Sequence, residues 1–346
     1  MIRSAFVNYH EKGVSPMSET REVDHICPEI ITQTPELLSI FQYIHSVVKS
    51  LQPILITGEP GTGKHLVAQC IHETSGLQGD LVRVDTARLD DQGFSETLFG
   101  VAKGASPEIE ADIPGKIDQA AGGTLYLDEI GYLSPGTQLK LLRLLQYGEY
   151  VPVGAETPRR SDAYILTSTD VDLWELQRAG GFRKDLNFKI RTHHVHVPSL
   201  RERIEDLPLL VDHFLEEAAQ TFGKKKPTPP KELFILLQTY SFPRNVTELK
   251  EMIFEAVERH TSKVLSLDVF KAHMEREERL ARERGFNEPS PFRVFKNLPT
   301  LKQASQLLVE EAMRRANGNQ SIAARMLGIS QPALSKRLKT EAQKTE

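Results

Sequence analysis

The sequence predicts an α/β domain built on a parallel sheet, followed by all-α segments towards the C-terminal end. Short apolar runs of strand length alternate with stretches of helical spacing, and these runs lie at residues 53–57, 81–84, 124–127 and 163–167. Such alternation is typical of a parallel sheet with helices on both faces. After Pro198 only helical spacing remains, at residues 207–219, 231–239 and 246–260. We therefore expect an all-α lid after the sheet, and a further helical unit near the end of the chain.

The composition excludes several classes of protein. Of the 346 residues, 39% are hydrophobic and 26% are charged, which is typical of a globular chain. No apolar stretch reaches the roughly 18 residues that a membrane-spanning helix needs, and the N-terminus lacks the apolar core of a signal peptide. Cys27 and Cys70 are too few for a disulfide framework or a four-ligand zinc site. We expect two unpartnered thiols in a cytoplasmic protein that does not bind membranes.

The patterns divide the chain into five segments. They are a polar tail over 1–28, an α/β segment over 29–199, a helical lid over 200–262, a charged linker over 263–299 and a helical unit over 300–346. The last unit holds eight Lys and Arg residues against four Glu, although the whole chain has a formal net charge of −4. Charge is therefore segregated by domain. Because only about 29 residues precede the α/β segment, we expect no separate sensory domain before it.

A glycine-rich segment after the first strand has the pattern that surrounds phosphate. The pattern G-x-x-x-x-G-K is formed by Gly58, Glu59, Pro60, Gly61, Thr62, Gly63 and Lys64. Glycine lets backbone N–H groups approach phosphate oxygens, and the N-terminus of the next helix adds partial positive charge. Lys64 is expected to reach the β- and γ-phosphates. His65 stands where the general pattern has a Ser or Thr that holds Mg²⁺.

Two carboxylates at the end of a later strand support the same interpretation. The apolar run at 124–127 ends in Asp128 and Glu129. Asp128 is expected to lie near the Mg²⁺ of a bound nucleotide, and Glu129 to polarise an attacking water. Together the two motifs predict a site for ATP, or another purine nucleotide, with Mg²⁺.

These motifs resemble those of bacterial enhancer-binding proteins, the AAA+ ATPases that activate sigma-54 RNA polymerase. The resemblance covers about residues 29–262, and its further matching stretches are residues 98–100, 115–130, 138–143, 182–186 and 198–203. It implies an AAA+ P-loop fold with an all-α lid, and self-association as a dimer or a hexamer. In that family the residue after the loop lysine is usually Glu, so the absence of a Ser or Thr hydroxyl at His65 is shared with the family.

The resemblance also assigns roles at positions where this sequence departs from the family. Arg183 and Lys189 match the two arginines that a neighbouring subunit offers to the γ-phosphate. Asp170 matches a sensor position usually held by Asn, and Thr247 matches a lid arginine that touches the nucleotide. Asp85 matches an Asn that restrains the catalytic Glu. A lysine lacks the planar fork of an arginine, so we expect ATP binding with weak or absent hydrolysis.

The loop that contacts the sigma factor differs as well. The family's sequence at this loop is G-A-F-T-G-A, in which Phe and Thr make the contact, and here residues 104–109 are G-A-S-P-E-I. Ser106, Pro107 and Glu108 offer no exposed aromatic ring at the tip, and Pro107 restricts the backbone. We expect that contact with sigma-54 is lost.

The C-terminal unit resembles a Fis-type helix-turn-helix. Gly328 supplies the turn, Ser330 is suited to begin the second helix, and Ala324 is small where the helices approach. The second helix is expected to present Gln331, Ser335, Lys336 and Lys339 to double-stranded DNA, with amide and hydroxyl groups for base edges and cations for phosphates. In this comparison the helix over residues 301–316 pairs two subunits.

The sequence thus predicts a transcription regulator that binds ATP and DNA, contacts RNA polymerase, and acts without the sigma-54 form. Two alternatives remain open. The first is an active AAA+ ATPase that remodels sigma-54 RNA polymerase. The second is a sensor in which the ATP site binds a different signalling nucleotide.

Overall fold

The computed structural model describes residues 27, 29–262, 264–283, 299–316 and 318–342. The chain divides into two compact units, and the boundary between them in the sequence lies between Met274 and Glu275. The tail predicted over 1–28, apart from Cys27, and residues 284–298 of the predicted linker lie outside the described residues. Among the helices that the structure describes, none has the length and apolar character needed to cross a membrane.

The predicted parallel sheet is confirmed and has five strands. These are β1 (Ile54–Thr57), β2 (Leu81–Asp85), β3 (Thr124–Asp128), β6 (Tyr164–Thr169) and β7 (His193–His196). Their order in the sheet is β2-β3-β6-β1-β7, and every neighbouring pair is parallel. The central strands are apolar on both faces, as buried parallel strands are. The edge strand β7 is mostly histidine, so its sequence carries little of that apolar signal.

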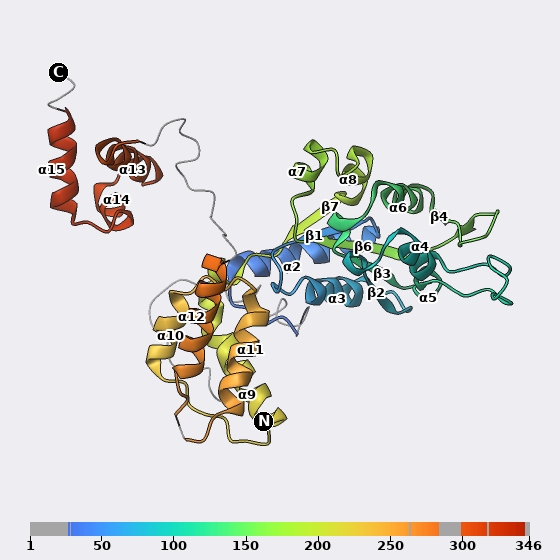
Figure 1. Ribbon diagram of the computed structural model, residues 1–346, viewed down its shortest axis with the longest axis horizontal. Coiled ribbons are helices and arrows are strands. Elements are labelled where there is room, and N and C mark those ends of the chain that lie inside the picture. Colours follow the sequence, from blue (N-terminus) through green and yellow to red (C-terminus); the bar gives the residue numbers. More distant parts are fainter. Residues whose placement is uncertain (1–26, 28, 263, 284–298, 317, 343–346) are drawn as a thin grey trace. The chain divides into compact units, whose positions relative to one another are not determined.

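Helices cover both faces of the sheet, as predicted (Figure 1). Alternate residues of β3 separate the two faces: Tyr126 packs in one core, and Leu125 and Leu127 pack in the other. The Tyr126 face is covered by α2 (Pro35–Val47) and α3 (Lys64–Ser75). The opposite face is covered by α4 (Asp91–Phe99), α5 (Lys116–Gln119), α6 (Pro135–Tyr147), α7 (Leu173–Arg178) and α8 (Lys184–Ile190). A short antiparallel pair follows α6, formed by β4 (Glu149–Tyr150) and β5 (Arg159–Arg160).

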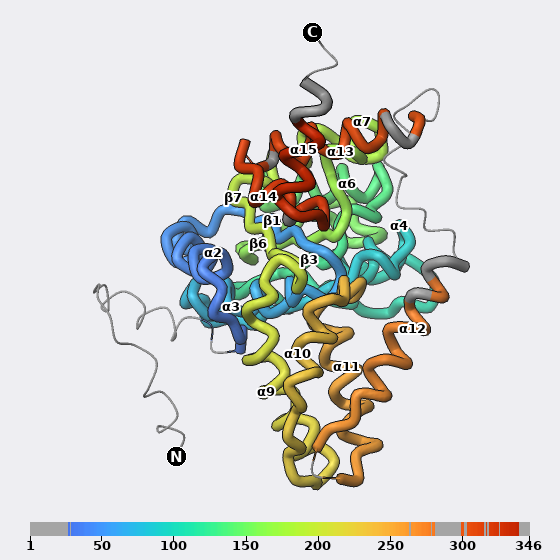
Figure 2. Tube along the Cα trace, turned by 90° about the vertical axis from the view of Figure 1, so that its left-hand side faces the viewer, coloured from blue at the N-terminus to red at the C-terminus, as the bar shows by residue number. Residues whose placement is uncertain are grey.

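The lid is a separate helical bundle with its own core (Figure 2). It consists of α9 (Leu207–Thr221), α10 (Lys231–Gln238), α11 (Asn245–Glu258) and the first part of α12 (Asp268–Glu283). Leu265, Phe270 and Met274 belong to this core, so it continues beyond the boundary drawn at residue 262. The reason is that α12 begins with apolar residues at helical spacing before the charged run that looked like linker.

The C-terminal unit contains α13 (Leu301–Arg315), α14 (Gln320–Met326) and α15 (Gln331–Ala342). Its small core includes Ala323, Ala324 and Leu334, with Ile329 packed against them. Gly328 has a φ of 65°, a left-handed conformation that favours glycine and that turns the chain between α14 and α15. The predicted pair of helices joined by a tight turn is therefore present.

The two cysteines are joined, so the expectation of two unpartnered thiols was wrong. A disulfide links Cys27 to Cys70, with their Cα atoms 5.3 Å apart. Cys70 lies on the buried side of α3, and Cys27 packs in the same apolar core, just before the residues that lead into α2. The sequence could not show this because the two residues are 43 positions apart and only the packing of the N-terminal segment onto α3 brings them together.

This pairing has a direct chemical test. Protein unfolded without reductant is expected to give no reaction with a maleimide, and protein unfolded after reduction is expected to take up two labels, counted by mass spectrometry. A double Cys27→Ser, Cys70→Ser variant, which has no thiol, is the negative control and is expected to take up no label after reduction. Two labels on protein that was purified and unfolded without reductant would show that both thiols are free.

Candidate functional site

The predicted phosphate loop connects the end of β1 to the start of α3. Gly61 and Gly63 have φ values of 76° and 98°, which other residues adopt only with strain. A Cβ atom at Gly61 would lie 2.1 Å from the carbonyl oxygen of Arg244, so the lid approaches the loop too closely for any side chain there. The loop therefore has both the backbone freedom and the close packing that its glycines predict.

Lys64 is brought to the strand-end carboxylates, as the motifs predict. It is the first residue of α3 and is only 7% exposed. Its Nζ donates to the carbonyl oxygen of Gly58 at 3.0 Å and forms an ion pair with Glu129 Oε1 at 2.9 Å. The side chain is thus held inside the loop, with its charge balanced by a residue of the neighbouring motif.

Asp128 accepts several hydrogen bonds at the end of β3. Tyr126 donates its hydroxyl at 2.9 Å, Ser168 donates a second hydroxyl, and Arg83 forms an ion pair on the other carboxylate oxygen. Burial alone would raise the pKa of Asp128, but the bonds from Ser168, Arg83 and Tyr126 outweigh it and hold the pKa below its usual value. The carboxylate is therefore charged at neutral pH, and Oδ2, which accepts from Arg83, keeps a further lone pair for a cation.

Glu129 lies in a strained backbone conformation next to the loop. Its φ of 62° and ψ of 48° are left-handed, which is costly for a residue with a side chain and is typical of functional sites. Its carboxylate contacts Lys64 and accepts the backbone N–H of Asp170 at 3.0 Å. Burial raises the pKa of Glu129, although the ion pair with Lys64 opposes that shift. A carboxylate of raised pKa is better suited to accept a proton from water.

Two acidic residues near this site have partners of their own. Asp85 is level with Asp128 in the β2–β3 register, and its carboxylate accepts the N–H of Ala87 and pairs with Arg88 at 2.9 Å. Asp170 accepts the Tyr132 hydroxyl at 3.5 Å. Both carboxylates therefore have partners within this chain, and that of Asp85 is paired with a cation.

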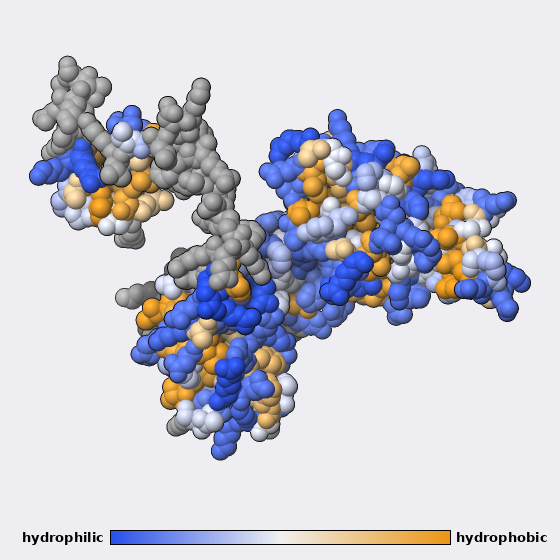
Figure 3. All heavy atoms as spheres, in the orientation of Figure 1, coloured by the Kyte–Doolittle hydropathy of each residue, from blue (hydrophilic) through white to orange (hydrophobic). Residues whose placement is uncertain are grey.

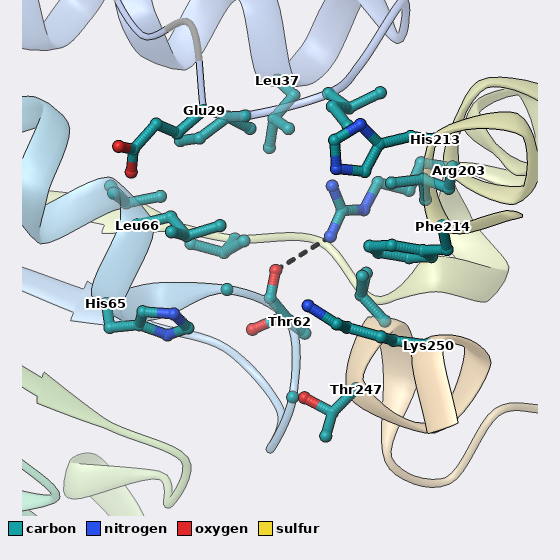
Figure 4. A pocket seen from close by; sticks show the side chains of 18 of the residues that line it. Glu29, Leu37, Thr62, His65, Leu66, Arg203, His213, Phe214, Thr247 and Lys250 are labelled. Carbon is teal, nitrogen blue, oxygen red and sulfur yellow. Dashed lines mark hydrogen bonds between the residues drawn. The ribbon is translucent and has the colours of Figure 1, made fainter. Parts of the chain in front are cut away.

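A cavity of about 400 Å³ lies between the phosphate loop and the lid (Figure 4). The loop contributes Gly61, Thr62, Gly63 and His65 to its wall, and α11 contributes Thr247. Sequence reasoning missed most of the remaining wall, which includes Glu29, Arg203, His213, Phe214, Glu217 and Lys250. These residues carry no local motif, because only the fold of the lid against the loop brings them together.

The lid is bonded directly to the phosphate loop. The backbone N–H groups of Val246 and Thr247, at the start of α11, donate to the carbonyl oxygen of Gly61 at 3.0 and 3.4 Å. Asn245 donates its side-chain amide to the carbonyl oxygen of Pro60 at 3.0 Å and to Glu59 at 3.1 Å. Arg201 forms a bidentate pair with that same Glu59 carboxylate. The loop and the lid are therefore held together by hydrogen bonds of both backbone and side chains.

The two residues assigned to act on a neighbouring subunit lie on α8 and at its start. Arg183 is exposed and forms an ion pair with Asp185 at 2.7 Å. Lys189 lies in the last turn of the same helix. Neither residue lines the cavity beside the phosphate loop. Arg244 does not reach the cavity with its guanidinium, which pairs with Glu251.

The loop at 104–109 closes on itself. The N–H of Gly104 donates to the carbonyl oxygen of Ile109 at 2.9 Å, and the N–H of Ile109 donates to that of Ser106 at 3.1 Å. The exposed tip carries Pro107 and Glu108. The loop thus presents a rigid residue and a negative charge.

The candidate DNA-contacting residues lie on α15. Gln331 and Lys336 are exposed, and Ser335 is half-buried. Lys339 belongs to α15, but its side chain lies outside the described residues. The Ser330 hydroxyl accepts the N–H of Ala333 at 3.4 Å, which caps the helix as predicted.

Three family models match the chain and together cover nearly all of the described residues. The sigma-54 interaction domain matches residues 30–196, the AAA+ ATPase lid domain matches 201–285, and the bacterial regulatory protein, Fis family, matches 300–340.

Characterised regulators are similar along most of this chain. It is 33% identical over 318 residues to the transcriptional regulatory protein XylR of Pseudomonas putida, covering 89% of this chain and 56% of XylR. It is 32% identical over 344 residues to the DNA-binding transcriptional regulator NtrC of Azospirillum brasilense, and 33% identical over 327 residues to ZraR of Escherichia coli. The alignments cover 93% and 92% of this chain and 71% of each relative.

Solved structures of one similar regulator have the same fold. NtrX from Brucella abortus in complex with ATP superposes with a TM-score of 0.65 at 28% identity, over 93% of this chain and 72% of NtrX. The same protein in complex with ADP gives 0.67 at 26% identity. With its sigma-54 interaction domain, its lid and its Fis-type end in this order, the chain belongs to the family of bacterial sigma-54-dependent transcriptional regulators, the enhancer-binding proteins.

Proposed function

We propose that this chain is a regulator that binds ATP and DNA and acts at promoters without remodelling the sigma-54 polymerase. The observation that carries the proposal is the loop at 104–109. Ser106 and Pro107 stand where the family has Phe and Thr, and Glu108 adds a negative charge at the tip. Backbone hydrogen bonds close the loop around these residues. A negative charge and a rigid ring cannot replace a buried aromatic contact.

ATP is supported as the ligand by the geometry of the loop. Gly61 and Gly63 leave room for close approach, Lys64 lies inside the loop, and the cavity beside it extends to the lid. Asp128 is charged, and its Oδ2 keeps a lone pair for a hard cation. When bound, Mg²⁺ would neutralise phosphate charge there. A related NtrX was solved in complex with ATP and with ADP.

Weak hydrolysis is supported by the groups that surround the γ-phosphate position. Lys189 stands in place of an arginine, and it lacks the planar fork that stabilises spread phosphoryl charge. Asp170, whose backbone N–H orients Glu129, adds a carboxylate where an amide is usual. Binding depends on the loop, which is intact, and turnover depends on these altered groups.

DNA binding and self-association are supported by the C-terminal unit. The exposed side chains on α15 include an amide and a cation, which suit base edges and phosphates. Hydrophobic side chains are visible on the surface of this unit (Figure 3), and on α13 Leu307 and Leu308 are 41% and 58% exposed. Their apolar surface fits pairing of two copies through α13. We place the protein in the cytoplasm, where bacterial DNA is.

Binding without turnover is the first test of this proposal. Titration calorimetry is expected to show ATP binding to the wild type, and Lys64→Ala is expected to weaken it at least tenfold, because a charge-assisted bond to phosphate is lost. Steady-state phosphate release is expected to stay near background with and without DNA. The double variant Lys189→Arg, Asp170→Asn is the matched gain-of-function control, with an expected rise of about tenfold or more. Rapid turnover by the wild type would favour an active remodelling ATPase.

The role of the loop is tested by transcription in vitro with purified sigma-54 RNA polymerase. On a sigma-54 promoter that carries a binding site for this protein, ATP is expected to produce no open complexes above the level without regulator. The quadruple variant Ser106→Phe, Pro107→Thr, Glu108→Gly, Ile109→Ala restores the family loop and is expected to gain affinity for sigma-54. Open complexes that depend on wild-type protein and ATP would contradict the proposal.

Variants of α15 test the DNA interface. Lys336→Ala is expected to weaken binding to all sequences and to lower the salt slope of affinity by about 1, because one phosphate contact is lost. Gln331→Ala is expected to relax specificity at one base position, at a cost of about 1–3 kcal/mol. Arg314→Ala, on α13, is the matched control and is expected to bind as wild type in fluorescence anisotropy. Equal affinity for all three variants would place the DNA interface elsewhere.

A further inference from the structure

The lid side of the cavity holds a cation that none of the sequence motifs assigns. Lys250 lies on α11, three residues after Thr247, so both face the cavity from one side of the helix. In the close-up its side chain extends from α11 towards Thr62 of the phosphate loop (Figure 4). Thr247 carries no charge, so Lys250 brings positive charge to this part of the wall.

The side chain of Lys250 is positioned by contacts to α9 and to its own helix. Its Nζ forms an ion pair with Glu217 Oε1 at 2.7 Å and lies 5.6 Å and 5.2 Å from the ring centres of Phe214 and Phe254. The side chains of Lys250 and Glu217 are 43% and 39% exposed, so the pair is partly solvated and contributes little to stability. Lys250 can therefore exchange Glu217 for a more highly charged anion at a small cost in free energy.

Arg203 and Arg244 are committed elsewhere. Arg203 also lines the cavity, but it is only 2% exposed and its Nη2 donates to the carbonyl oxygen of Thr62 at 2.9 Å. Arg244 pairs with Glu251 on the outer side of α11. Lys250 differs from Arg203 because it is partly exposed and its ion-pair partner is a partly exposed carboxylate, and it differs from Arg244 because it lines the cavity.

We propose that Lys250 is a nucleotide-binding residue of the lid. When a nucleotide occupies the phosphate loop, the Lys250 ammonium breaks its ion pair with Glu217 and contacts the phosphates. The inference rests on the proposed function, since it requires ATP at Lys64. It identifies the phosphates, and not the base, as the group that this side chain recognises, because an ammonium binds as a compact point charge. The exchange also links phosphate binding to the contact between α9 and α11.

The test compares three variants of the full chain by calorimetry with ATP and AMP in the presence of magnesium chloride. Lys250→Met keeps the methylenes that pack on the two rings and is expected to weaken ATP binding about tenfold, with AMP affected much less. Lys250→Arg keeps the charge and is expected to stay within about twofold of wild type for both ligands. Glu217→Gln removes the resting partner and is expected to leave ATP affinity equal or increased. Thermal unfolding of each variant checks that it is folded.

The controls separate the outcomes. Unchanged ATP affinity in Lys250→Met, with wild type binding normally, overturns this inference alone. An equal loss in Lys250→Met and Glu217→Gln also overturns it, because the pair would then serve only to hold α9 against α11. If Lys250→Met does not fold, a loss of ATP affinity in Glu217→Gln decides against the proposal and a gain supports it. Absence of ATP binding in wild type would instead overturn the proposed function.

Discussion

The parallel pairing of β1, β6 and β3 is the constraint on which the rest of the site depends. In this register Thr57 lies level with Thr169, and Leu127 lies level with Thr167, so the carboxyl ends of all three strands meet at one edge of the sheet. The loop after β1 and the acidic pair after β3 therefore meet as well, although many residues separate them in sequence. The ion pair between Lys64 and Glu129 is a direct result of this strand arrangement.

The lid depends on that edge in turn. Because Gly61 has no side chain, α11 approaches close enough to donate two backbone N–H groups to its carbonyl oxygen. Asn245 and Arg201 add side-chain bonds from the lid to Glu59. The cavity lies between the phosphate loop and the lid, so its shape depends on the hydrogen bonds that join them.

This chain has the phosphate-loop pattern of the family that it belongs to and differs from the family pattern at single positions around it. Residues 58–64 have the phosphate-loop pattern, and the loop at 104–109 has as many residues as the family's six-residue loop. What differs is the charge and shape of single side chains, among them Lys189 and Glu108. Substitutions of this kind alter differential stabilisation of a transition state or a partner contact without disturbing the fold. This combination is the basis of the proposal that the module binds ATP with weak hydrolysis.

The sequence by itself determined the sheet, the order of its motifs and the helix-turn-helix, because each depends on local periodicity or on a short run such as residues 58–64. The tertiary structure alone decided three things. Cys27 and Cys70 form a disulfide because the N-terminal segment packs on α3, against the expectation of unpartnered thiols. The lid core continues to Met274. Lys250, Arg203 and Glu29 line the cavity because the lid, the loop and the N-terminal segment meet there, and residues that far apart in the chain leave no local pattern to read.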